Sequence, residues 1–145
     1  MDQVIDKLNE FLKGNHMAIH AYEEYIQRVK DGDAKKLFQR IQQEHKRHAI
    51  LLAERIQNLG GVPVDGVGLK GAAIELMKKL QGASDDTFSI LQDAAKGEEV
   101  GIKIGKEVVK GDLDPESLAM VKRILDADQN HVEALHAQLQ NPSPL

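Results

Sequence analysis

Long stretches of this chain place apolar residues every three or four positions, and short stretches rich in glycine, aspartate and proline separate them. Steps of three and four keep side chains on one face of an α-helix, so each long stretch predicts an amphipathic helix. The four stretches cover about residues 2–30, 34–59, 86–110 and 115–140. The pattern therefore predicts an all-α protein built from four long helices.

Turn and capping residues indicate where these helices end. Asp-Gly-Asp at 31–33 predicts a tight turn, and Gly60-Gly61 followed by Pro63 predicts the end of the second helix. Ser-Asp-Asp at 84–86 are good capping residues for the third helix. Asp114 and Pro115 predict the N-cap and the first residue of the fourth helix. Residues 141–145 are expected to form a frayed tail.

The connection between the second and third helices is much longer than the other two. Residues 60–83 exceed what a turn between adjacent helices needs, and the amphipathic segment 69–80 predicts a short helix within them. Short turn, long crossover and short turn is the connectivity of an antiparallel four-helix bundle with one crossover. A length of 145 residues is that of one domain, expected to span 1–145.

Composition excludes several classes of function. The net charge is 19 − 23 = −4 without a basic block, which argues against a nucleic-acid partner. The chain has no cysteine, so disulfides, thiolate metal ligands and cysteine nucleophiles are excluded. No apolar run approaches the roughly 20 residues of a membrane span. A cytoplasmic protein without a membrane partner is the simplest interpretation.

Each predicted helix carries polar residues where its apolar face requires aliphatic ones. A buried carboxylate or imidazole destabilises a protein unless it is paired, hydrogen-bonded or bound to metal. Pairs three residues apart share one helix face, and the short turns are expected to place Asn15 level with His48 and Glu98 level with His131. All these positions then converge on one layer that is suited to holding metal. They are Asn15, His45, His48, Glu98, Asp128 and His131.

A metal-free interpretation stays open at this point. A hydrogen bond between Asp128 and His131, or between Glu98 and a histidine, would also satisfy the cluster. The two halves of the chain resemble each other faintly at an offset of 83 residues, since Asn15 corresponds to Glu98 and His48 to His131.

Several of these residues stand in a known pattern. Gly97-Glu98-Glu99, Asp128-x-x-His131, His48-Ala49, and Ala18 and Tyr22 after Asn15 resemble the ferritin-like superfamily. That superfamily includes rubrerythrins, bacterioferritins and related di-iron carboxylate proteins, and the resemblance covers about residues 8–140. It is closest to small bacterial members and implies an antiparallel ferritin-like bundle. It also implies one Glu on each of the first and third helices and Glu-x-x-His on the second and fourth.

Three positions depart from that pattern. Asn15 and His45 occupy places of glutamates, although Glu44 is next to the second place, and Asp128 is a shorter carboxylate. Imidazole in place of carboxylate favours zinc, copper, nickel or a single iron over a pair of hard ions. The expected metal is iron, with zinc and manganese as alternatives. The expected ligand set is His45, His48, Glu98, Asp128, His131, Asn15 and Glu44.

Two functional hypotheses follow. The first is a ferritin-like metal-binding protein with a modified, partly degenerate di-metal site, acting in iron handling or in oxidative or general stress. If it is an enzyme, it is a weak ferroxidase-like or peroxidase-like oxidoreductase, and a homodimer is one option for its assembly. The alternative is a non-catalytic structural or interaction bundle with a metal-free polar core. Asn15 and His45 separate the two, because a di-iron enzyme requires glutamate at both places.

Overall fold

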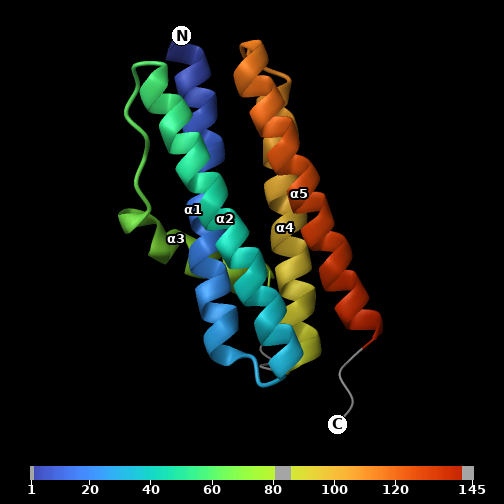
Figure 1. The fold of residues 1–145 in the computed structure, drawn as a ribbon. Helices are drawn as coiled ribbons and strands as arrows, with labels where there is room; N and C mark the ends of the chain where they lie inside the picture. The colour runs from blue at the N-terminus through green and yellow to red at the C-terminus, as the bar shows by residue number, and fades with distance from the viewer. Residues whose placement is uncertain (1, 81–85, 142–145) are drawn as a thin grey trace.

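Four long helices lie side by side in the computed structural model, which describes residues 2–80 and 86–141 (Figure 1). They are α1 (Asp2–Arg28), α2 (Gly32–Asn58), α4 (Thr87–Val109) and α5 (Pro115–Gln140). A 3-10 turn, η1 (Val67–Leu69), and a short helix, α3 (Lys70–Leu80), lie in the connection between α2 and α4. The predicted all-α bundle with one long crossover and a short helix inside it is confirmed.

The crossover sets the directions of the helices. Helices α1 and α2 form one hairpin, α4 and α5 form the other, and α4 packs beside α1 while α5 packs beside α2. Figure 1 shows that α2 and α4 run in the same direction, opposite to α1 and α5. Every neighbouring pair is therefore antiparallel, and the middles of all four helices lie at one level.

Side-chain caps fix where three helices begin. Asp31 accepts a hydrogen bond from the backbone N–H of Ala34, so α2 begins at Gly32, two residues before the predicted start. Asp86 caps α4 in the same way, while the predicted capping residues Ser84 and Asp85 lie outside the described residues. Asp114 caps α5 and Pro115 is its first residue, as predicted.

The other ends agree with the predictions to within two residues. Helix α1 ends at Arg28 rather than at residue 30. At the end of α2, Gly60 has a φ of 88°, a left-handed conformation that favours glycine. Of the predicted tail, residues 142–145 lie outside the described residues.

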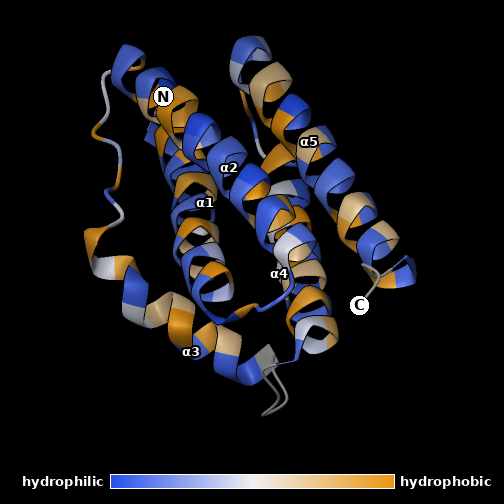
Figure 2. Ribbon diagram, turned by 60° about the horizontal axis from the view of Figure 1, so that its bottom comes forward, coloured by the Kyte–Doolittle hydropathy of each residue, from blue (hydrophilic) through white to orange (hydrophobic). Residues whose placement is uncertain are grey.

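The apolar core has two parts. The first is formed by the end of α1, the start of α2, the start of α4 and the end of α5, and includes Tyr22, Phe38, Ile90 and Leu135. The second fills the other end of the bundle and includes Leu8, Leu52 and Ile56. Hydrophilic residues cover the outer faces of the long helices (Figure 2). The polar layer described below lies along the helices between these two apolar clusters.

Helix α1 buries a wider stripe than its sequence periodicity predicts. The periodicity predicts an apolar stripe that includes Ile5, Leu8, Leu12 and Ile19. Val4, Phe11 and Tyr25 are buried in addition, whereas Ile5 and Ile19 are only partly buried. Helix α1 contacts α3 as well as α2 and α4, and Tyr25 packs in the same apolar cluster as Met77 of α3. Val4 and Phe11 instead pack with residues of α2, α4 and α5. Figure 2 shows α3 on the outside of the bundle.

Polar contacts fasten the crossover to α1. The side chain of Asn9 donates to the carbonyl of Val62 and accepts from the N–H of Val64. The Nε2 atom of His20 lies 2.8 Å from the carbonyl oxygen of Gly66. These contacts hold the segment that precedes α3 against α1. Within the described part of the chain, none of the helices has the length and apolar character to cross a membrane.

Candidate metal centre

Four side chains of the ligand type meet in the middle of the bundle. His45 comes from α2, Glu98 from α4, and Asp128 and His131 from α5. Each offers one ligand atom, and these four atoms all lie within 4.8 Å of one another. All four residues are buried, with exposed fractions of 2–6%. These four members of the predicted polar layer therefore meet and are excluded from solvent.

Glu98 receives two short contacts. Its Oε1 atom lies 2.7 Å from the hydroxyl of Tyr22, which donates to it, and 2.7 Å from Nε2 of His45. The Nδ1 atom of His131 is 3.5 Å away, which is too long for a good hydrogen bond but close enough for an ion pair. One carboxylate of α4 thereby contacts α1, α2 and α5.

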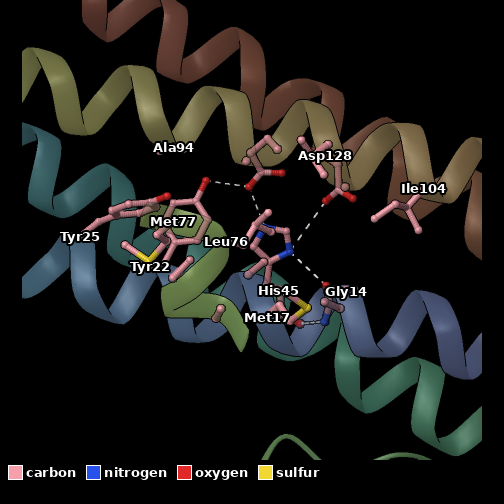
Figure 3. Close-up of a pocket in the computed structure, with 18 of the residues that line it drawn as sticks. Gly14, Met17, Tyr22, Tyr25, His45, Leu76, Met77, Ala94, Ile104 and Asp128 are labelled. Atoms are coloured by element: carbon pink, nitrogen blue, oxygen red, sulfur yellow. Dashed lines mark hydrogen bonds and ion pairs between the residues drawn. The ribbon is translucent and has the colours of Figure 1, made fainter. Parts of the chain in front are cut away.

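Asn15 holds His45 in place. Its amide nitrogen donates to the backbone carbonyl of His45, and its Oδ1 atom lies 3.0 Å from Nδ1 of the same imidazole. Both ring nitrogens of His45 therefore face oxygen acceptors. Figure 3 shows a further dashed line from the His45 ring to Asp128, which is 3.9 Å from Nδ1. Asn15 thus contacts a candidate ligand, and a hydrogen bond to the second ring nitrogen is how metal-binding histidines are commonly oriented.

This contact corrects the predicted register of α1 and α2. Asn15 was expected to lie level with His48, but it pairs with His45 in the structure. Helix α1 ends at Arg28 and α2 begins at Gly32, so the middle of the turn is Lys30. Residues equally distant from that point lie side by side, and Asn15 and His45 satisfy this condition. Glu98 and His131 come together as expected.

Burial and charge act in opposite directions on the two carboxyl groups. Burial would raise the pKa of Glu98, but the neighbouring His45 and His131 outweigh it and lower this pKa to about 2. Burial raises the pKa of Asp128 to about 7; the histidines oppose this rise, and the charge of Glu98 adds to it. Burial would lower the pKa of His131, but the carboxylates of Glu98, Asp128 and Glu44 raise it above its ordinary value.

Several polar atoms of the cluster have no hydrogen-bond partner among the described residues. They are Oδ1 of Asp128, both ring nitrogens of His131 and Nδ1 of His48. Buried polar groups are nearly always hydrogen-bonded, and unsatisfied ones call for a specific explanation. A metal ion would satisfy Asp128 and His131 together.

The spacing of these atoms suits one ion. Around a tetrahedral ion with bonds of about 2.1 Å, ligand atoms lie about 3.4 Å apart. The Nδ1 atom of His131 is 3.5 Å from Oε1 of Glu98 and 3.5 Å from Oδ1 of Asp128. His45 is closer to Glu98, at hydrogen-bond distance, and would have to move apart from it. Two carboxylates would also balance the charge of a divalent ion, so the residues fit a metal.

The remaining predicted ligands lie at the edge of the cluster. His48 is half-buried and its ring stands edge-on to that of His45, with centroids 6.2 Å apart. Burial, with His45 and His131, lowers the pKa of His48 to about 4. The side chain of Glu44 is 31% exposed, and its Oε1 atom lies 3.3 Å from Nε2 of His131. Among the described residues, the group of four whose ligand atoms converge includes neither of them.

Sequence analysis did not include Tyr22 in the site. Its hydroxyl donates to Glu98, and burial, together with the charge of that carboxylate, raises the pKa of Tyr22 well above its ordinary value. A signal was available, because Tyr22 follows Asn15 by seven residues, two helical turns, and so lies on the same face.

Comparison with known proteins identifies the family of this chain. A family model described as "Domain of unknown function (DUF2383)" matches residues 3–111. The chain belongs to this family. No curated protein matches it.

Solved structures similar to this chain are ferritin-like. The dodecameric thioferritin from Bacteroides fragilis, a bacterioferritin-related protein, is 27% identical with a TM-score of 0.78, over 95% of this chain and 84% of that one. A Dps1 mutant from Mycobacterium smegmatis is 16% identical with a TM-score of 0.83, over 94% of each chain. A ferritin-like di-iron carboxylate protein from Bacillus anthracis is 23% identical with a TM-score of 0.71, over 95% of this chain and 96% of that one. The fold of this DUF2383 member is therefore that of the ferritin-like superfamily.

The raised pKa of Asp128 gives a testable dependence of stability on pH. The metal-free folded protein binds this proton more tightly than the unfolded chain, with a pKa of about 7 against the ordinary 3.8. The resulting stabilisation is complete below about pH 4 and is lost as the pH rises towards 7. Asn has no proton to lose, so Asp128→Asn should gain in stability relative to the natural protein as the pH rises from about 5 to 8.

Urea unfolding with a chelator present measures this difference. We expect the advantage of Asp128→Asn to grow by at least about 1 kcal/mol between the two pH values, since one pKa unit corresponds to about 1.4 kcal/mol. An advantage that stays constant, or shrinks, would show that Asp128 is charged in the folded protein throughout this range.

Proposed function

We propose that this protein binds a divalent transition-metal ion inside the bundle through His45, Glu98, Asp128 and His131. Its function is that of a ferritin-like protein with a modified metal site, in iron handling or in protection against oxidative and general stress. The observation that carries the proposal concerns two buried side chains, Asp128 and His131. Each has side-chain atoms without a hydrogen-bond partner among the described residues, and both belong to the group of four whose ligand atoms converge. Iron is the preferred metal, with zinc and manganese as alternatives, and the cytoplasm is the expected location.

The donor set supports a transition metal over magnesium or calcium. Two imidazoles and two carboxylates suit iron or zinc, whereas hard ions such as magnesium and calcium prefer oxygen ligands alone. Asn15 and Tyr22 would orient His45 and Glu98 through their hydrogen bonds. Partly exposed Glu44 and half-buried His48 lie between the cluster and solvent, and they give an ion a polar path of entry.

One observation favours the metal-free alternative. His45 already has an oxygen acceptor at each ring nitrogen, and Glu98 already receives two short contacts. With a proton on each ring nitrogen of His45, that half of the cluster is a satisfied network without any ion, because a neutral imidazole donates through one nitrogen only. The other half consists of Asp128 and His131, which lack hydrogen-bond partners unless a metal ion is bound. The tests below therefore change His131, and also Asn15 and His45, which stand in the places of glutamates.

Metal retention by two histidine variants of the same helix, α5, tests the proposal. Replacing His131 with alanine should lower the affinity for Fe²⁺, Zn²⁺ and Mn²⁺ by more than about 100-fold, because even the loss of a residue that only orients a ligand costs 10–100-fold. His136→Ala is the matched control, since His136 is also on α5 but its side chain is 51% exposed. Untagged protein would be loaded without oxygen, desalted and analysed for metal.

We expect about one ion per chain in the natural protein and in the His136→Ala control, and no retained ion in His131→Ala. Equal retention in all three would place the metal elsewhere. No retention in any of them would favour the structural bundle with a metal-free core.

Iron oxidation should be slow in the natural protein. Rapid oxidation requires two ions about 3.5–4 Å apart, joined by bridging carboxylates. Here the two departing positions, Asn15 and His45, are hydrogen-bonded to each other and supply no such bridge. Changing both to glutamate removes both partners of that hydrogen bond together and restores two carboxylates. The rate of Fe²⁺ oxidation, followed by absorbance, should rise at least about tenfold in the Asn15→Glu, His45→Glu variant.

The matched control is Asn15→Gln, His45→Gln, which has side chains of the same length without charge. It should oxidise Fe²⁺ as slowly as the natural protein. The account of the modified site fails if the natural protein is as fast as the glutamate variant, or if that variant folds and binds iron without a gain in rate.

A further inference from the structure

Glu44 lies outside the group of four converging ligands, but its carboxylate faces one of them. It precedes His45 on α2, its side chain is 31% exposed, and its Oε1 atom lies 3.3 Å from Nε2 of His131. The other ring nitrogen of His131, Nδ1, lies 3.5 Å from Oε1 of Glu98 and 3.5 Å from Oδ1 of Asp128. The two nitrogens of this imidazole therefore face different groups. Nδ1 faces the two buried carboxylates, and Nε2 faces a carboxylate at the edge of the cluster.

The contact between Glu44 and His131 is close but not yet a hydrogen bond. Neither ring nitrogen of His131 has a hydrogen-bond partner among the described residues, so the contact has the distance of an ion pair without the alignment of a hydrogen bond. By contrast, Oδ1 of Asn15 lies at hydrogen-bond distance from Nδ1 of His45. Glu44 stands in the corresponding place beside His131, and its partly exposed side chain has room to adjust.

The chemistry of imidazole gives this arrangement a role. A neutral imidazole carries one proton, so it can bind an ion through one nitrogen and donate a hydrogen bond through the other. Metal-binding histidines commonly donate this second N–H to a carboxylate, a backbone carbonyl or water, which fixes the tautomer and the direction of the ring. An ion beside the two buried carboxylates would take the lone pair of Nδ1 and leave the proton of His131 on Nε2. Nε2 would then be a donor, with Glu44 as its acceptor.

We propose that Glu44 is a positioning residue of the metal centre. It accepts a hydrogen bond from Nε2 of His131 and thereby holds the imidazole with Nδ1 towards the ion, without binding the ion itself. This inference rests on the proposed function, and it changes the role of Glu44 from the expected ligand to the partner that orients a ligand. Glu44 thus sets the affinity of the centre, since the loss of such a partner lowers metal affinity 10–100-fold.

The zinc affinities of three full-length variants, measured by competition with a chelating dye, test the role of this carboxylate. Glu44→Leu removes the acceptor and should bind Zn²⁺ at least about tenfold more weakly than the natural protein. Glu44→Gln keeps an acceptor oxygen without the charge, so its affinity should lie between those two. Glu54→Leu is the matched control, because Glu54 is an exposed glutamate of the same helix. Its affinity should equal that of the natural protein.

The ring of His131 gives a second readout, which a loss of stability alone would not change. In two-bond ¹H–¹⁵N correlation spectra of the zinc-loaded natural protein, we expect the proton of His131 on Nε2 and zinc on Nδ1. A proton on Nδ1, with zinc on Nε2, would overturn the proposal, because Nε2 would then have no proton to donate to Glu44. An affinity of Glu44→Leu equal to that of the natural protein would also overturn it. Failure of the natural protein to bind zinc would instead contradict the proposed function itself, and this inference with it.

Discussion

The buried carboxylate of Glu98 holds the middle of this bundle together. Tyr22 of α1, His45 of α2 and His131 of α5 all approach its Oε1 atom, so one side chain of α4 contacts the three other long helices. A carboxylate with an exposed fraction of 5% strongly destabilises a protein unless such partners surround it. These contacts fix the level at which the helices meet, and the two apolar clusters pack on either side of that level.

The two hairpins use this layer differently, although their sequences resemble each other. At the place of Glu98, the first hairpin has Asn15, which is bound to His45 and contributes no charge. At the place of His131, it has His48, which is only half-buried. Both carboxylates of the four-residue group therefore come from the α4–α5 hairpin, and the first hairpin contributes one imidazole. This asymmetry supports the proposal of a single ion rather than a bridged pair.

Much of the fold could be predicted because local signals agreed with the tertiary structure. Asp114 and Pro115 fixed the start of α5, since a cap acts within one helical turn and depends little on the rest of the protein. The burial of Tyr25 was missed, because periodicity alone does not reveal that α3 covers a third side of α1. In the site, a step of three residues turns a side chain by about 60°, so one member of a pair can point inward while the other lies at the edge. His45 and His48 illustrate this, and only the packing of α2 decides which of them enters the cluster.

Anomalous diffraction from crystals of the metal-loaded protein tests the central claim most directly. Data collected on both sides of the absorption edge of iron or zinc would locate the ion without assumptions about its ligands. The account predicts one strong peak per chain, about 2.0–2.2 Å from ligand atoms of Glu98, Asp128, His131 and His45. Ordered crystals with no peak inside the bundle, or with a peak only at surface histidines such as His136, would contradict it.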